Sequence, residues 1–232
     1  MFGTTVNALA IASGSILGLI FKNSVLKKYN STVMHALGLA VMLIGLKSAF
    51  KTENILLLIS SLAIGSVIGE LLRIEDRLEN MGKFIETKFS RNSQGVAEGF
   101  VTASLVYCVG SMAVIGSLES GLTGNHQTLF AKSVIDGISS VIFASSLGIG
   151  VIFSSVSVFL YQGFITISSS SIKDYLTPSV VTEMSAIGGL LIAAIGLKML
   201  EIKSLKIGNM LPSIIIPLVY YIFKLLIFGS GV

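Results

Sequence analysis

Apolar runs of about 20 residues recur along almost the whole chain, and they limit the possible folds more than any other feature. A helix needs about 20 predominantly apolar residues to cross a bilayer. Hydrophobic residues make up 53% of the 232 residues and charged residues 12%, and the mean hydropathy is +0.88. We therefore predict an all-α, polytopic transmembrane helix bundle, a single membrane domain over residues 1–232 that contacts the lipid bilayer.

Eight segments can be drawn as spans, which leaves no room for a separate soluble domain. They cover residues 3–21, 32–50, 55–72, 98–118, 133–153, 155–172, 179–200 and 210–228. The sixth is the weakest, because residues 133–172 can turn only near Gly148 and Gly150. Two crossings there give eight spans, whereas one crossing with a re-entrant segment gives seven. Lys203 and Lys206 favour eight, since eight spans place them on the cytoplasmic side.

Basic residues in the loops predict the orientation of the bundle. They follow the first and third spans: Lys22, Lys27, Lys28, Arg73, Arg77, Lys83, Lys88 and Arg91. By the positive-inside rule these loops are cytoplasmic and the N-terminus is outside. The loop at 119–131 has no Lys or Arg, as an external loop should. The net charge of +4 therefore reflects membrane topology, and we expect no nucleic-acid partner.

The one substantial polar region is 73–97, between the third and fourth spans. Its apolar residues recur at helical spacing opposite charged residues, which predicts a cytoplasmic amphipathic helix. The apolar positions are Ile74, Leu78, Met81, Ile85 and Phe89. This helix could dock a partner or sense lipid; the plainer interpretation is a helix that lies on the membrane face or packs on the bundle.

Two segments suggest an internal repeat, with a first unit at 1–72 and a second at 133–230. Gly38-Leu39 and the IGLK sequence at 44–47 recur as Gly189-Leu190 and IGLK at 195–198, a shift of 151 positions (196 − 45). Residues 12–21 resemble 144–153 at a shift of 132 (150 − 18). The difference of 19 is about one span, so the second-span unit and its copy would run antiparallel, as in transport folds. Chance matches between glycine-rich, aliphatic helices are the alternative.

Asp136 is the ionisable residue that a spanning helix should not carry, four residues into the predicted fifth span. A carboxylate inside a bilayer costs about 2.5 to 3.5 kcal/mol even on lenient scales, so it usually marks a site or a pathway. It could instead lie near external water. Asn7 has the matching depth in the first span, and the shift of 132 carries it onto Ser139, beside Ser140. The two faces are therefore expected to meet.

Three further polar residues are candidates for a substrate or ion path. Glu98 and Thr102 open the fourth span, where Glu98 could also cap the helix. Gln162 lies within an apolar run and needs a partner on another helix or a substrate. No catalytic triad, phosphate loop or histidine-pair zinc motif occurs, and Cys108 is the one cysteine. We expect no enzyme activity, no metal and no cofactor.

Several motifs resemble the YdfK/YqgA family of bacterial inner-membrane proteins, over nearly the entire chain. They are AEGFVTASL at 97–105, CVGSMA at 108–113, AKS at 131–133 with DG at 136–137, FAS at 143–145, YQG at 161–163, IGGLL at 187–191 and NMLP at 209–212. Lys198 departs from the family, which usually has asparagine there. The resemblance implies a polytopic fold in the bacterial inner membrane, but supplies no substrate because the family has no known function.

The repeat and Asp136 together predict a transporter for a small solute or ion. The alternatives are an ion channel, or a scaffold or regulatory membrane protein without a permeation path. A polar cavity at membrane depth would favour transport. Small residues on the span faces also predict a homo-oligomer.

Overall fold

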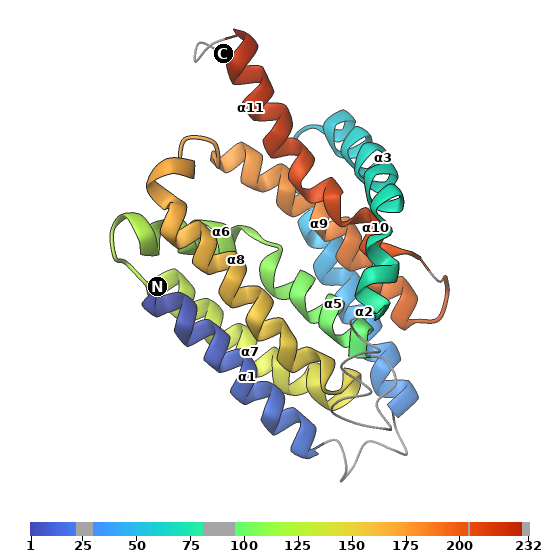
Figure 1. Ribbon diagram of the computed structural model, residues 1–232. Helices are drawn as coiled ribbons and strands as arrows, with labels where there is room; N and C mark the ends of the chain where they lie inside the picture. The colour runs from blue at the N-terminus through green and yellow to red at the C-terminus, as the bar shows by residue number, and fades with distance from the viewer. Residues whose placement is uncertain (22–29, 81–95, 204, 229–232) are drawn as a thin grey trace.

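The computed structural model describes residues 1–21, 30–80, 96–203 and 205–228, and the regular elements in this part of the chain are all helices (Figure 1). In chain order they are α1 (Phe2–Phe21), α2 (Asn30–Ala49), α3 (Ile55–Leu72), α5 (Val96–Cys108), α6 (Ser111–Leu122), α7 (Gln127–Leu147), α8 (Gly150–Ile172), α9 (Pro178–Met199), α10 (Ile207–Met210), the 3-10 helix η1 (Leu211–Ile215) and α11 (Ile216–Phe228). The predicted all-α class is confirmed. Of the predicted amphipathic helix, residues 74–80 are helical, and 81–95 lie outside the described residues.

The chain is a multi-pass membrane protein with six to seven candidate spans. Six helical segments are long and apolar enough to cross a bilayer, and α5 with α6 makes a seventh if this bent pair is one crossing. The predicted count was seven or eight. The difference lies in α2, whose apolar part, Met34–Ala49, is shorter than a full span.

The boundary between the predicted fifth and sixth spans is wrong by six residues. α7 ends at Leu147, and Gly148 has a φ of 82°, a conformation that glycine adopts without steric cost. α8 then starts at Gly150 and runs for 23 residues. Residues 133–172 therefore form parts of two long helices, as the two-crossing interpretation predicted. α7 also begins at Gln127, so residues 127–131 of the predicted external loop are helical.

The predicted fourth span is not one continuous helix. α5 and α6 are bent by 59° at the break between them, where Gly110 has a φ of 139°. The side chain of Val109 lies against Gly188 of α9, where a Cβ would collide with it. A broken helix at membrane depth requires protein around the freed backbone groups, and α8 and α9 both contact this pair.

The first three helices pack mainly on the second half of the chain. α1 lies along α7 and α8, α2 along α9, and α3 along α10 and η1, and Figure 1 shows α1 and α7 side by side. α1 runs parallel to α7, because Gly3 faces Leu129 and Gly18 faces Val141. The last helix, α11, projects from the bundle (Figure 1), and few of its residues are buried.

Glycines bring α2 and α9 into backbone contact, as expected for helices packing in lipid. A Cβ on Gly189 would lie 2.6 Å from Gly45 O, and a Cβ on Gly196 would lie 2.7 Å from Gly38 O. The helices are antiparallel. The residues nearest to a Cβ would be Gly196, Met199 and Leu200 for Gly38; Gly45, Ser48 and Ala49 for Gly189; Gly189 and Ala193 for Gly45; and Gly38 and Met42 for Gly196.

Candidate functional site

Asp136 lies at the middle of a long helix and is almost completely buried. It is the tenth residue of the 21 in α7 (136 − 127 + 1), and 3% of its surface is exposed. The predicted depth of four residues was wrong because α7 starts six residues before the predicted span. At a rise of 1.5 Å per residue, Asp136 is about 13 Å from the start of the helix, and its burial argues against the alternative of a carboxylate that meets water at the surface.

The counter-ion of Asp136 is Lys132, one turn earlier on the same helix. Lys132 Nζ lies 3.0 Å from Asp136 Oδ1 and 2.9 Å from Asp136 Oδ2, and the two side chains are 9% and 5% exposed. Lys132 was not among the predicted site residues. The signal was present in the spacing, since residues four apart share one face of a helix.

Two amide side chains complete the cluster from the neighbouring helices. Asn7 of α1 donates through Nδ2 to Asp136 Oδ2 at 3.1 Å and to Gln162 Oε1 of α8 at 3.4 Å. One turn away, the hydroxyls of Thr4 and Thr166 are 3.4 Å apart. Asn7 and Gln162 have no exposed surface. The structure thus brings together three predicted residues, Asp136, Asn7 and Gln162, and adds Thr4 and Thr166, which were not predicted as site residues.

Two atoms of this polar cluster have no hydrogen-bond partner. They are Asn7 Oδ1, an acceptor, and Gln162 Nε2, a donor. Both are buried within the helix bundle, where an unpaired polar group costs several kcal/mol. Such atoms in a native protein need an explanation, and a bound ligand or an ordered water molecule are two of the usual ones.

Within the described residues, no hydrogen bond joins the other predicted site residues to the side chains of this cluster. Ser139 and Ser140 donate to the carbonyls of Asp136 and Gly137 in their own helix, at 3.1 and 2.7 Å. Glu98 is on α5, with Oε1 4.0 Å from Lys198 Nζ.

Thr102 is also on α5. It is 1% exposed, and within the described residues no hydrogen bond links it to Asp136 or Asn7. The sequence predicted that Glu98 and Thr102 lie at the start of a helix. It did not predict which helices α5 would pack against.

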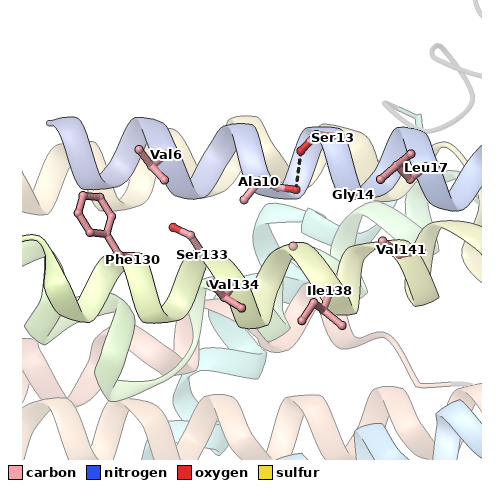
Figure 2. Close-up of a pocket in the computed structure, with 11 residues that line it drawn as sticks. Val6, Ala10, Ser13, Gly14, Leu17, Phe130, Ser133, Val134, Ile138 and Val141 are labelled. Carbon is pink, nitrogen blue, oxygen red and sulfur yellow. Dashed lines mark hydrogen bonds between the residues drawn. The ribbon is translucent and has the colours of Figure 1, made fainter.

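A groove runs between α1 and α7 on the outer surface of the bundle. It has a volume of about 540 Å³ and is lined mainly by apolar or small residues, among them Val6, Leu17 and Val141. Figure 2 shows Val6 of α1 and Phe130 and Ser133 of α7 directed toward the space between the two helices. Its lining contains no charged residue. The groove therefore suits lipid chains, and it is not the polar cavity that would favour transport.

A second buried carboxylate, Glu183 of α9, stabilises the turn between α2 and α3. It accepts hydrogen bonds from Thr52 Oγ1 at 2.6 Å and from the backbone amides of Glu53 and Asn54 at 2.7 and 3.1 Å. Asn54 then caps α3 by accepting from Leu57 N at 3.0 Å. Glu183 thus holds the α2–α3 turn on α9, and its bonds leave it less free for a ligand than the amides of the cluster.

The cluster can bind and orient a small molecule, and its charges balance. Lys132 and Asp136 contribute one positive and one negative charge, and the amides and hydroxyls are neutral. Among the residues that the structure describes, no group of three or more His, Cys, Asp or Glu side chains could hold a metal ion.

The chain is similar to known proteins over nearly its entire length. A family profile described as "Protein of unknown function (DUF554)" matches residues 2–222. The chain belongs to the DUF554 family. This confirms the resemblance predicted from the sequence motifs. All the residues of the polar cluster lie inside the DUF554 match.

Two proteins illustrate the similarity. The "Uncharacterized membrane protein YdfK" of Bacillus subtilis (strain 168) is 34% identical over 221 residues, 94% of each chain. The "Uncharacterized protein YqgA" of Escherichia coli (strain K12) is 28% identical over 221 residues, 93% of this chain and 94% of the relative. No solved structure matches the chain. Membership of the DUF554 family thus supports a membrane protein and leaves its function to be argued from the site.

Proposed function

We propose that this protein transports a small polar solute or ion, which binds at the polar cluster between α1, α7 and α8. The observation that carries the proposal is a buried ion pair, Lys132 with Asp136, halfway along a membrane helix and bonded to an amide on another helix. Ionisable residues inside membrane helices are expensive, and they usually mark substrate or ion pathways.

We infer an inverted repeat from the packing of α2 on α9, and such a repeat would support the proposed function. Adding 151 to a residue of α2 gives its counterpart in α9, so Gly38 corresponds to Gly189 and Gly45 to Gly196. The neighbours of each glycine follow the same shift. Gly189 has neighbours at 45, 48 and 49, and adding 151 gives 196, 199 and 200, the neighbours of Gly38. Gly196 has neighbours at 38 and 42, and adding 151 gives 189 and 193, the neighbours of Gly45. Contacts that exchange in this way are those of a two-fold interface.

The other helices of the two units fit the same relation. α1 and α8 run antiparallel, because Thr4 faces Thr166 and Asn7 lies beside Gln162. α3 and the α10–η1 segment also run antiparallel, since Gly65 faces Ser213 and Gly69 faces Asn209. We therefore propose α1–α3 and α8–α11 as the two units, whereas the sequence motifs alone placed the start of the second unit at 133. The shift of 132 fits less well, because 144–153 contains the turn at Gly148.

Inverted repeats suit transport because substrate sites in such folds lie near the midplane, at the interface of the repeats. The Asn7–Gln162 contact is at the crossing of α1 with α8, one helix from each unit. α7 is then the additional crossing that reverses the second unit, and α2 is an eighth span. The predicted homo-oligomer stays a prediction.

The non-transporting scaffold is the competing function. The apolar groove and the closed ion pair both favour it, since a packed bundle needs no path. Loss of transport in a variant of the binding site, with the fold intact, would decide against the scaffold.

Four crossings up to the end of α6 place the loop between α6 and α7 on the same side as the N-terminus. The positive-inside rule predicts that this side is external. With Cys108 replaced by alanine, the Asn125→Cys variant should react with a membrane-impermeant maleimide added outside whole cells. Asn125 lies in the loop at 123–126 and is exposed. Labelling that occurs only after the membrane is opened would reverse the proposed orientation. The Cys108→Ala parent, without a thiol, measures the background.

Transport should depend on Asn7, which the structure places against Asp136 and Gln162. The Asn7→Val variant introduces the residue that the shift of 151 brings to the equivalent position, Val158. It removes two hydrogen bonds at the cluster, so we expect uptake to fall by at least about tenfold, the equivalent of roughly 1.4 kcal/mol. The measurement is uptake of a panel of labelled solutes into proteoliposomes.

The matched control for this uptake experiment is Ser13→Ala, on the exposed side of α1. Ser13 donates to Leu9 O in its own helix at 2.7 Å, and uptake should be unchanged. Wild-type protein that carries no solute of the panel, or equal uptake by wild type and Asn7→Val for every solute carried, would contradict the proposed function.

A further inference from the structure

We propose that the polar cluster binds an uncharged molecule that carries a hydrogen-bond donor and an acceptor side by side, as a carboxamide or a urea does. This inference rests on the proposed function for its place in transport, but binding can be tested without flux.

The first argument is the charge balance. Lys132 Nζ contacts both carboxylate oxygens of Asp136, at 2.9 and 3.0 Å. A cationic ligand would have to displace Lys132, and an anionic ligand would have to displace Asp136. Either exchange leaves a buried charge without its partner, which is strongly unfavourable. A neutral ligand requires neither.

The second argument is the orientation of the two amides. Asn7 must present its NH₂ group to Asp136, because its carbonyl oxygen would be repelled by the carboxylate. The same Nδ2 then donates to Gln162, which must present its oxygen. This chain of bonds fixes which atoms are left without partners: Asn7 Oδ1 and Gln162 Nε2.

The unpaired atoms define the complementary chemistry. Asn7 Oδ1 needs a donor, and Gln162 Nε2 needs an acceptor. A primary carboxamide offers an N–H and a C=O on one carbon, so one planar group can satisfy both atoms. The hydroxyls of Thr4 and Thr166 lie beside the amides and can each donate or accept, which suits further polar atoms of a neutral ligand.

Four probes of nearly the same planar shape test the charge and the polarity separately. They are acetamide, which is neutral with donor and acceptor; acetone, which is neutral with an acceptor alone; acetate; and acetamidinium. Binding to the full-length protein in nanodiscs is measured by ligand-observed nuclear magnetic resonance at tens of millimolar, since molecules this small bind weakly. We expect acetamide to bind more strongly than the other three.

Two variants of Gln162 identify the site. Gln162→Leu should weaken acetamide binding by about tenfold, and Gln162→Glu should lose acetamide and gain acetamidinium, because it replaces the donor with a carboxylate. Ser61→Ala is the control: the Ser61 hydroxyl is also buried without a partner, but on α3, and its loss should leave binding unchanged. If neither variant of Gln162 folds, the four probes on the wild-type protein still decide.

Stronger binding of acetate or acetamidinium to the wild type would overturn the inference. So would four equal signals, or acetamide binding that survives in folded Gln162→Leu; water alone would then satisfy the amides. Acetamide binding without uptake of any solute would refute transport while the ligand class stands. Uptake of a charged solute that depends on Asn7 would refute the ligand class while transport stands.

Discussion

Replacement of Asp136 by leucine is expected to destabilise the protein by about 3 to 5 kcal/mol, because it leaves the Lys132 ammonium buried without a counter-charge. Lys132→Met should have a similar cost for the same reason. The double variant, Lys132→Met with Asp136→Leu, should recover most of the loss, since an apolar pair of similar volume removes both buried charges. The measurement is unfolding in mild detergent, analysed as a double-mutant cycle.

The exposed pair of Lys206 and Glu70 provides the control for this cycle. Lys206 Nζ lies 3.0 Å from Glu70 Oε1, but the side chains are 65% and 61% exposed, so solvent screens the pair and Lys206→Met should change little. A double variant at 132 and 136 as unstable as its worse single variant would show that the cluster needs its charges in order to fold.

The ion pair also changes how the charge of Asp136 can be tested. Asp136→Asn keeps the size of the side chain, but it isolates the Lys132 charge at membrane depth. A loss of flux in that variant would therefore mix a functional effect with a folding effect. Asp136→Asn combined with Lys132→Met separates the two.

A methyl group on a glycine of the α2–α9 crossing is expected to be the second most damaging change. Gly45→Ala should destabilise the protein by about 1 to 3 kcal/mol, because the added Cβ meets the backbone of Gly189 and Ala193, which cannot move aside as a flexible side chain can. Gly196→Ala, the counterpart in the proposed repeat, should lose a similar amount. The loss is measured by thermal or denaturant unfolding in detergent.

Gly137→Ala is the matched control on a helix of similar composition. A Cβ there would lie 3.4 Å from Ala10 Cβ, an ordinary contact, and alanine gains up to about 1 kcal/mol in helix propensity over glycine. Its stability should be equal to or above that of the wild type. A neutral Gly45→Ala, or losses that differ widely between Gly45→Ala and Gly196→Ala, would weaken the case for the repeat.

The sequence predicted the positions of the helices better than it predicted where some of them end. Hydropathy locates a span because lipid demands apolar side chains, so α1, α3 and α9 lie within two residues of prediction. The turn at Gly148 and the bend at Gly110 interrupt apolar stretches without any change in composition. In lipid a glycine that turns the chain and a glycine that packs a helix look alike in the sequence.

Single polar residues of the candidate site were predictable from the sequence, but the contacts that join them were not. Asp136, Asn7 and Gln162 stand out because each is polar within an apolar helix. Lys132 was not predicted as a site residue, because the predicted span began after it, at residue 133. The pairing of Thr4 with Thr166 depends on the crossing of α1 with α8, which one sequence without an alignment does not specify.

The packing of the first three helices on later ones has a consequence for biosynthesis. α1 must wait for α7, about 125 residues further along the chain, and α2 must wait for α9. At bacterial translation speeds of roughly 5 to 20 residues per second, that delay is on the order of ten seconds. During it, the candidate spans α1 and α3 lack the later helices that cover them, so Asn7 of α1 and the glycine face of α3 are without their partners. The nascent protein is therefore expected to be vulnerable to membrane proteases until α7, α9 and the α10–η1 segment have all been made.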